Sequence, residues 1–179
     1  MDYSKWYGTQ SEGKLEIGIS LVWVTGWINQ FLHFLANVRK HQNDRVRGEL
    51  TPRELRQAKE QIIKTTQQQC FPDEIQALKD NKPLPKSTLL KITPKLYGGL
   101  VRSNARLRYS DDLPEETKFP IILQKNHIVT KLIVKYHHEM EGHKMGVNLT
   151  LNHLREKYFV VQGRQQVKRC IKECAECNR

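Results

Sequence analysis

His138-Glu139-Met140-Glu141-Gly142-His143 and Cys174-Ala175-Glu176-Cys177 decide the fold of the C-terminal part of this chain. Two imidazoles and two thiols are the side chains that zinc prefers in a closed tetrahedral site, and a Cys-x-x-Cys turn can present both sulfurs to one ion. Residues 144–173 separate the pairs, which is enough chain for two helices that fold back. The spacing predicts a structural zinc ion on His138, His143, Cys174 and Cys177, with no position left for a catalytic water.

Neighbouring histidines and cysteines leave alternatives open. His137 could bind the ion in place of His138, but successive helical residues point about 100° apart, so only one can face it. Cys170 lies four residues before Cys174 on the inward helical face, which favours a buried small apolar residue over a fifth ligand. The other such residues are interpreted as surface, capping or core positions: His127, His153 and Cys70.

From Asn126 onward, apolar residues recur with helical spacing and predict three short helices. Asn126 is the expected cap of the first, and Gly163 begins the third. The residues that mark the three inward faces are Val129, Leu132, Ile133 and Tyr136, then Val147, Leu151, Leu154 and Tyr158, then Val167, Cys170, Ile171 and Cys174. Three helices of this size bury little apolar surface, so a metal ion is expected to hold them together.

Helix and turn signals also organise the preceding segment. Thr51-Pro52-Arg53-Glu54 reads as a capping box followed by a helix to about Gln69. Pro72 ends that helix, and Asp73 opens a shorter one through Leu78. Beyond the linker 82–86, residues 89–123 read as β-structure and turns. The expected strands lie in the apolar run 89–92, in two pieces of 100–109 about Ser103-Asn104, and in 120–123.

The segment from Ile17 to Val38 carries no charge and is long enough to span a bilayer. A polar stripe nevertheless recurs every four residues on one helix face, and such residues are costly in hydrocarbon. Its members are Thr25, Asn29, His33 and Asn37. A packed or interfacial amphipathic helix is therefore preferred to a membrane span or a partner-binding helix. The predicted fold class is α+β and mostly helical, with parts 1–48, 49–125 and 126–179.

The chain is basic: thirty Lys and Arg face nineteen Asp and Glu, for a formal net charge of +11. This balance favours a polyanionic partner. Arg164, Lys168 and Lys172 recur every four residues on the third C-terminal helix. They are either a solvated helix face or a row of phosphate contacts.

The His-x4-His and Cys-x2-Cys pairs, with Gly146-Val147, Thr150-Leu151 and Tyr158-Phe159 between them, resemble the zinc-binding N-terminal domain of retroelement integrases. Upstream residues resemble the preceding segment of BEL/Pao retrotransposon polyproteins. They are the segments 84–87, 99–102, 106–107 and 120–127 and, more loosely, the helices from Ile17 and Glu49. Three features depart from the family pattern: Phe159 in place of a common Trp, Ser103-Asn104-Ala105 in place of a Gly-rich turn, and the extra thiol of Cys170.

This resemblance implies DNA-end binding, assembly with integrase subunits, and action in the nucleus during integration. The four cysteines, three of them in the last ten residues, and the lack of a signal-peptide pattern at the start independently favour a reducing compartment inside the cell. The family spacing also selects His138 over His137. Integrases join DNA with a carboxylate triad on a downstream core, which two-metal phosphoryl transfer requires. The chain ends two residues after Cys177, so it is expected not to be an enzyme by itself. The alternatives are a zinc-stabilised protein–protein adaptor that binds no DNA and a membrane-anchored protein.

Overall fold

The computed structural model describes residues 51–104, 109, 112–140, 143 and 146–178. The apolar segment 17–38 lies outside the described residues. Among the helices that are described, none is both long enough and apolar enough to cross a membrane. The chain divides into two compact units between Ile63 and Lys64, a boundary that falls within helix α2 (Pro52–Cys70).

In the first unit, the described residues form the start of α2. Thr51 Oγ1 accepts from the backbone N–H of Glu54 at 3.3 Å, and the backbone N–H of Thr51 donates to Glu54 Oε2 at 2.7 Å. These two bonds form a capping box that satisfies amides without partners inside the helix. The predicted helix start is confirmed, and α2 ends one residue beyond the expected Gln69.

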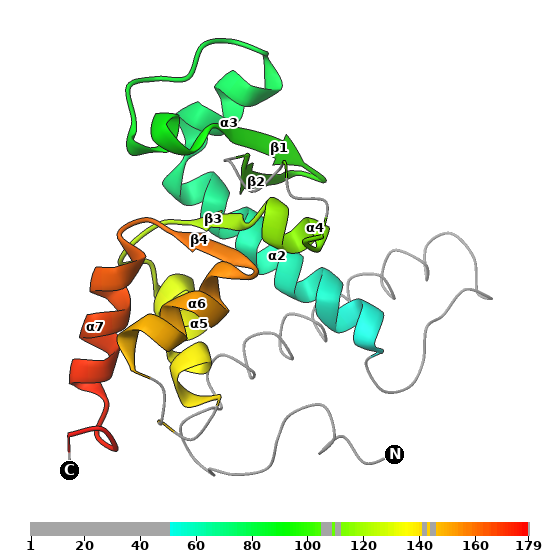
Figure 1. Ribbon diagram of the computed structural model, residues 1–179. Coiled ribbons are helices and arrows are strands. Elements are labelled where there is room, and N and C mark those ends of the chain that lie inside the picture. Colours follow the sequence, from blue (N-terminus) through cyan, green and yellow to red (C-terminus); the bar gives the residue numbers. More distant parts are fainter. Residues whose placement is uncertain (1–50, 105–108, 110–111, 141–142, 144–145, 179) are drawn as a thin grey trace. The chain divides into compact units, whose positions relative to one another are not determined.

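The second unit is α+β and mostly helical, as predicted (Figure 1). After α2 its elements are α3 (Pro72–Lys79), the 3₁₀ helix η2 (Thr88–Ile92), β1 (Pro94–Tyr97), β2 (Leu100–Ser103), α4 (Glu115–Lys118), β3 (Ile121–Leu123), α5 (Ile128–Glu139), α6 (Val147–Arg155), β4 (Tyr158–Val160) and α7 (Gly163–Glu173).

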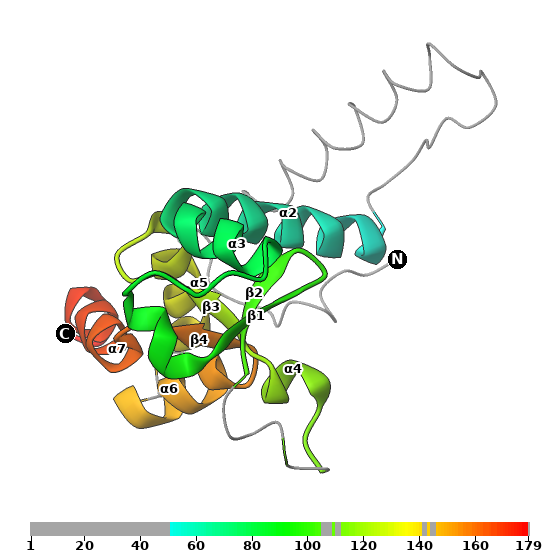
Figure 2. The ribbon, with the colours of Figure 1, turned by 90° about the horizontal axis from the view of Figure 1, so that it is seen from above.

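A small sheet of order β1-β2-β3-β4 joins strands that precede α5 to the strand that follows α6 (Figure 2). β1 and β2 form a hairpin whose turn residues Gly98 and Gly99 have φ of 58° and 80°, a region that glycine enters without steric cost. β2 pairs with β3 antiparallel, and β3 pairs with β4 parallel. Because α5 and α6 lie between β3 and β4 in the chain, this parallel pair encloses two of the three C-terminal helices.

Several local predictions were wrong. The apolar run 89–92 forms η2 rather than a strand, while residues 94–97 form the unpredicted strand β1. The second strand expected within 100–109 falls mostly outside the described residues. Tyr158 begins β4 instead of continuing the face of α6, because three residues pair with β3 there. α5 is capped by His127, whose Nδ1 accepts from the backbone N–H of Val129 at 3.2 Å, while Asn126 adopts φ of 64°.

A buried glutamine joins α2 to the sheet. Gln67 Nε2 donates to the carbonyl oxygens of Val101 at 2.8 Å and Ile122 at 2.7 Å, and Gln67 Oε1 accepts from the N–H of Val101 at 2.8 Å. β2 and β3 share a single paired position, Arg102 with Ile121. The Gln67 amide therefore satisfies backbone groups that a longer strand pair would have bonded.

Candidate metal centre

The four predicted ligands come from the ends of α5 and α7. His138 lies in the last turn of α5 and is fully buried, and His143 follows that helix with φ of 63°. Cys174 caps the C-terminus of α7, and Cys177 lies in the turn beyond it. α5 and α7 pack against each other, which brings their C-terminal ends together.

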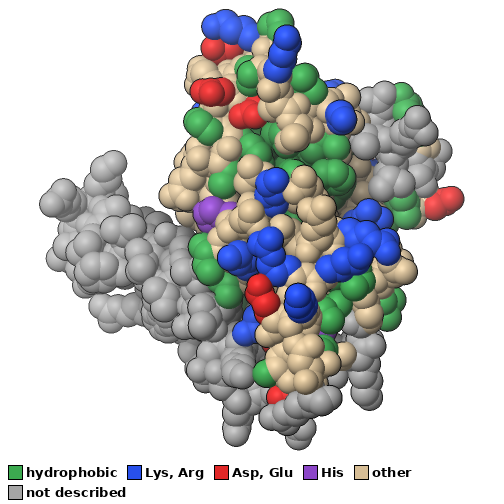
Figure 3. All heavy atoms as spheres, turned by 90° about the vertical axis from the view of Figure 1, so that its left-hand side faces the viewer, with side chains coloured by type: hydrophobic (Ala, Val, Ile, Leu, Met, Phe, Trp, Pro, Cys, Tyr) green, Lys and Arg blue, Asp and Glu red, His purple; other side chains and the backbone are tan. Residues whose placement is uncertain are grey.

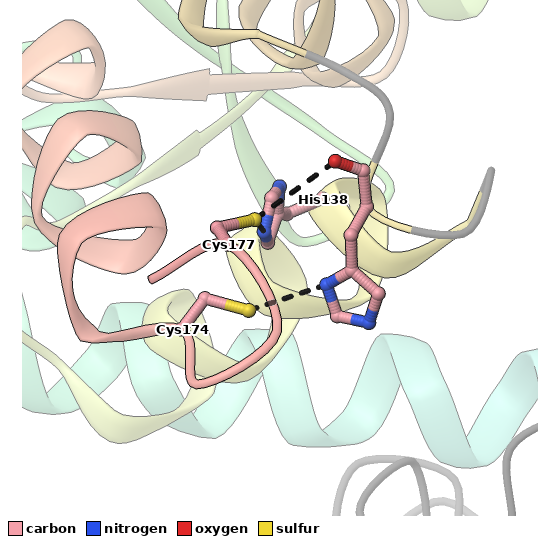
Figure 4. A group of neighbouring side chains, drawn as sticks. His138, Cys174 and Cys177 are labelled. Atoms are coloured by element: carbon pink, nitrogen blue, oxygen red, sulfur yellow. Dashed lines mark hydrogen bonds between the residues drawn. The ribbon is translucent and has the colours of Figure 1, made fainter. Parts of the chain in front are cut away.

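The donor atoms converge in pairs (Figure 4). Cys174 Sγ lies 3.2 Å from His143 Nδ1, and Cys177 Sγ lies 3.3 Å from His138 Nε2. One donor atom from each of the four side chains lies within 4.8 Å of the others. The two imidazole rings stand nearly perpendicular, with their centroids 5.2 Å apart.

This geometry fits a tetrahedral zinc ion. Zn–S bonds of about 2.3 Å and Zn–N bonds of about 2.0 Å place nitrogen and sulfur roughly 3.5 Å apart around one ion. The two nitrogen–sulfur distances in the structure are within a few tenths of an ångström of that value. Two thiolates and two imidazoles are also the donor set of structural zinc sites, and they complete the coordination sphere. The predicted cofactor, zinc, fits these residues.

The family model described as the integrase zinc binding domain matches residues 125–179. Residues 125–179 are therefore similar to an integrase zinc-binding domain. Such a domain is distinct from the catalytic core of an integrase. No curated protein and no solved structure matches the chain.

Electrostatics in the zinc-binding module favour a bound cation. Burial, and secondarily His143, lowers the pKa of His138, so its imidazole is neutral and able to bind metal at physiological pH. Desolvation raises the pKa of Cys177, and the neighbouring Cys174 and Glu176 raise it further. A divalent ion removes the repulsion between the two thiolates, so metal binding releases protons and weakens as the pH falls.

The structure separates the roles of the adjacent histidines. His138 directs Nε2 at Cys177, whereas the ring of His137 packs edge-on against Tyr158, with centroids 6.0 Å apart. Both side chains are buried, but only His138 belongs to the cluster of donor atoms. His137 is therefore a packing residue between α5 and β4.

Substituting each histidine tests this separation. We expect His138→Phe to lose bound zinc, since three ligands remain and a closed site needs four. His137→Phe should retain one equivalent of zinc, because an aromatic ring still packs on Tyr158. Metal analysis of the two purified variants measures the difference. Equal zinc content in both would contradict the assignment of His138.

The remaining predicted thiol and imidazole positions lie outside the cluster. Cys170 is half-buried, and burial, with Glu139 as the next cause, raises its pKa to about 11, so the thiol stays protonated at physiological pH. Cys70 packs against the core cluster of the second unit, and burial raises its pKa. His127 caps α5, and His153 lies 3.8 Å from Glu156. None of these four belongs to the metal cluster found among the described residues.

The predicted basic row lies on the exposed face of α7. Arg164, Lys168 and Lys172 are all exposed, and Figure 3 shows blue Lys and Arg side chains gathered on the side of the molecule where α7 lies. No carboxylate within ion-pair distance of these three occurs in the described part of the chain. The spacing of four missed Arg169, which is also exposed and donates to Asn126 Oδ1 at 3.0 Å.

Proposed function

We propose that this chain supplies the structural zinc module of a retrotransposon integrase, of BEL/Pao type, and supports DNA-end binding and assembly of integrase subunits. It acts inside the cell, in the nucleus during integration, and contributes no catalytic core of its own. The observation that carries the DNA role is the row of exposed cations on α7, the helix whose C-terminus supplies Cys174 to the metal centre.

The surface of α7 has the charge pattern of a phosphate-binding helix. Its first turn contains no acidic residue, and the exposed Arg164 lies there, where the helix dipole also attracts anions. Lys168 and Lys172 continue the row by one turn each. Their side chains offer charge rather than base-edge recognition, so the expected association is with the DNA backbone and depends on salt.

His138, His143, Cys174 and Cys177 would hold a zinc ion, and the bound ion would fix the C-terminal end of this helix. Contacts within the protein also fix the orientation of the helix. Cys174 caps α7 by donating its backbone N–H to the carbonyl of Ile171 at 3.2 Å, and Val167 is fully buried on the inner face of α7. With its inner face packed and its end held, α7 presents Lys168 and Lys172 in a constant orientation.

The triple variant Arg164→Glu, Lys168→Glu, Lys172→Glu tests the row. Three phosphate contacts replaced by repulsion should lower the affinity for duplex DNA at low salt by about tenfold or more. The slope of log K against log salt concentration should become less negative by about 2 to 3. Fluorescence anisotropy with a labelled duplex over a salt series measures both effects. Zinc content and circular dichroism establish that the variant is folded.

A matched control reverses the same number of charges elsewhere. Lys86, Lys91 and Lys95 are exposed and lie away from α7, so their conversion to Glu should leave the salt slope nearly unchanged. If the α7 variant binds DNA as tightly and with the same slope as the unmodified protein, the row is a solvated helix face.

A protein–protein adaptor is the second candidate. Three large apolar side chains on or beside α5 and α6 are strongly exposed: Ile128 at 61%, Met140 at 51% and Leu149 at 47%. Such side chains can contribute to an interface with another copy or a partner. An adaptor would show no salt-dependent retention of DNA, and the anisotropy series above separates it from the integrase module.

A further inference from the structure

A pocket of about 250 Å³ opens between α5 and α7. His138 and Cys174 of the metal centre border one end of it. Away from that end, the lining residues are Lys131, Val134, Lys135, Gln166, Arg169 and Cys170. The zinc centre makes no use of these six side chains, and the exposed row of α7 does not include them.

The two helices run in the same direction along the pocket. Asn126, just before α5, accepts through Oδ1 from Gln166 Nε2 at 3.3 Å and from Arg169 Nη1 at 3.0 Å. At the other end, His138 faces Cys177, beyond the C-terminus of α7. Both helices therefore begin at the end of the pocket that lies away from zinc, and the partial positive charges of their N-termini add there.

The charged side chains that line the pocket are also separated along its length, with cations away from the zinc centre and carboxylates near it. Lys131 lies in the first turn of α5, and Arg169 bonds to Asn126 just before that helix. Neither cation has a carboxylate partner within ion-pair distance in the ranges that the structure describes. Glu139 and Glu173 lie toward the zinc end, where Lys135 contacts Glu139 at 3.9 Å. An anionic group is attracted to the first end and repelled from the second.

The middle of the pocket is apolar. Val134 is almost fully buried, and Cys170 is half-buried beside it. Asn126 holds the guanidinium of Arg169 at the rim, which reduces the entropy lost when Arg169 binds an anion. The pocket thus offers an uncharged floor between a cation from α5 and an oriented cation from α7.

We propose that this pocket binds an unpaired nucleotide at the end of a DNA strand, with its phosphates on Lys131 and Arg169 and its sugar and base over Val134 and Cys170. The inference rests on the proposed DNA role of α7. Stacked bases inside a duplex cannot enter a recessed pocket, whereas an unpaired nucleotide can be splayed out of the stack. Arg169 lies one helical turn from Lys172, so a strand that follows the row reaches the pocket.

The experiment compares two labelled DNAs on the full, zinc-loaded chain by fluorescence anisotropy at one salt concentration. One is a blunt duplex, and the other is the same duplex with a short single-stranded extension. We expect the extended duplex to bind about fivefold more tightly or better, the effect of burying roughly 40 Å² of apolar surface between one base and the floor of the pocket. The variant Lys131→Gln, Arg169→Gln should remove this preference, and Lys86→Gln, Lys91→Gln should retain it.

Arg169 contacts Asn126, so the single variant Lys131→Glu, at an exposed position, serves as the second test. It should lose the preference with unchanged zinc content and circular dichroism. Equal binding of both DNAs by the unmodified protein, or a preference that survives in both variants, would show that the pocket does not bind an unpaired nucleotide. Either result would leave the proposed role of α7 intact. If neither DNA binds, the proposed function is overturned together with the pocket.

Discussion

Removal of zinc by a chelator will unfold α5, α6 and α7. The free energy of zinc binding in small structural sites is about 10–16 kcal/mol, comparable to or larger than the whole stability of a typical domain. The buried residues of these helices are few, among them Val134, Leu154 and Val167. Helical circular dichroism at 222 nm should fall, and amide hydrogen exchange should localise the loss to residues 128–173. An unchanged spectrum after complete metal removal would show that the helices do not need the ion.

Two cysteine variants sharpen this test. Cys177→Ser removes a ligand and should reproduce the effect of the chelator without any chelator present. Cys170→Ser changes a thiol that lies outside the donor cluster and should retain zinc and helicity. Zinc retention should also be lost as the pH falls, because the thiolates and imidazoles take up protons that compete with the ion. If Cys170→Ser loses zinc and Cys177→Ser retains it, the assignment of Cys177 as a ligand is wrong.

Gln67→Met should destabilise the second unit by about 3 kcal/mol or more. Methionine matches glutamine in length, but it leaves the N–H of Val101 and the carbonyl oxygens of Val101 and Ile122 buried without partners, at about 1–3 kcal/mol for each unsatisfied group. Urea unfolding followed by circular dichroism, with zinc present throughout, measures the change.

The neighbouring Gln68 gives the control for that substitution. It is exposed on the same helix, so Gln68→Met should change stability by no more than about 0.5 kcal/mol. Equal effects at the two positions would mean that the hydrogen bonds of Gln67 contribute no stability beyond that of helix propensity and side-chain burial.

Features with a local cause were predictable from sequence. The capping box of Thr51 and Glu54 involves residues three apart, and the apolar spacing of α5 and α7 is read within a few turns of helix. The donor set at 138, 143, 174 and 177 was also recognisable, since few other arrangements use two imidazoles and two thiols at such spacing. The structure then distinguishes His138 from His137 through the packing of His137 on Tyr158.

Features that depend on distant residues were not predictable in this way. Tyr158 fits a helical spacing with Leu154, yet it begins β4 because residues 121–123 lie beside it. A buried glutamine on α2 gives no local signal, since its partners lie 34 and 55 residues away. Arg169 was overlooked because a spacing of four selects one row of a helix, and its role depends on contact with Asn126 across the pocket.

The parallel pairing of β3 with β4 limits how the zinc-binding segment can be handled in isolation. Ile121 donates its N–H to the carbonyl of Lys157 at 2.9 Å, and Val161 donates to the carbonyl of Leu123 at 3.0 Å. A fragment that begins at residue 126 lacks β3, so the N–H of Val161 and the carbonyl of Lys157 lose their partners. The edge of β4 is then exposed and can pair with another copy of the fragment. Expression boundaries for biochemical work should therefore be placed upstream of the β1–β2 hairpin.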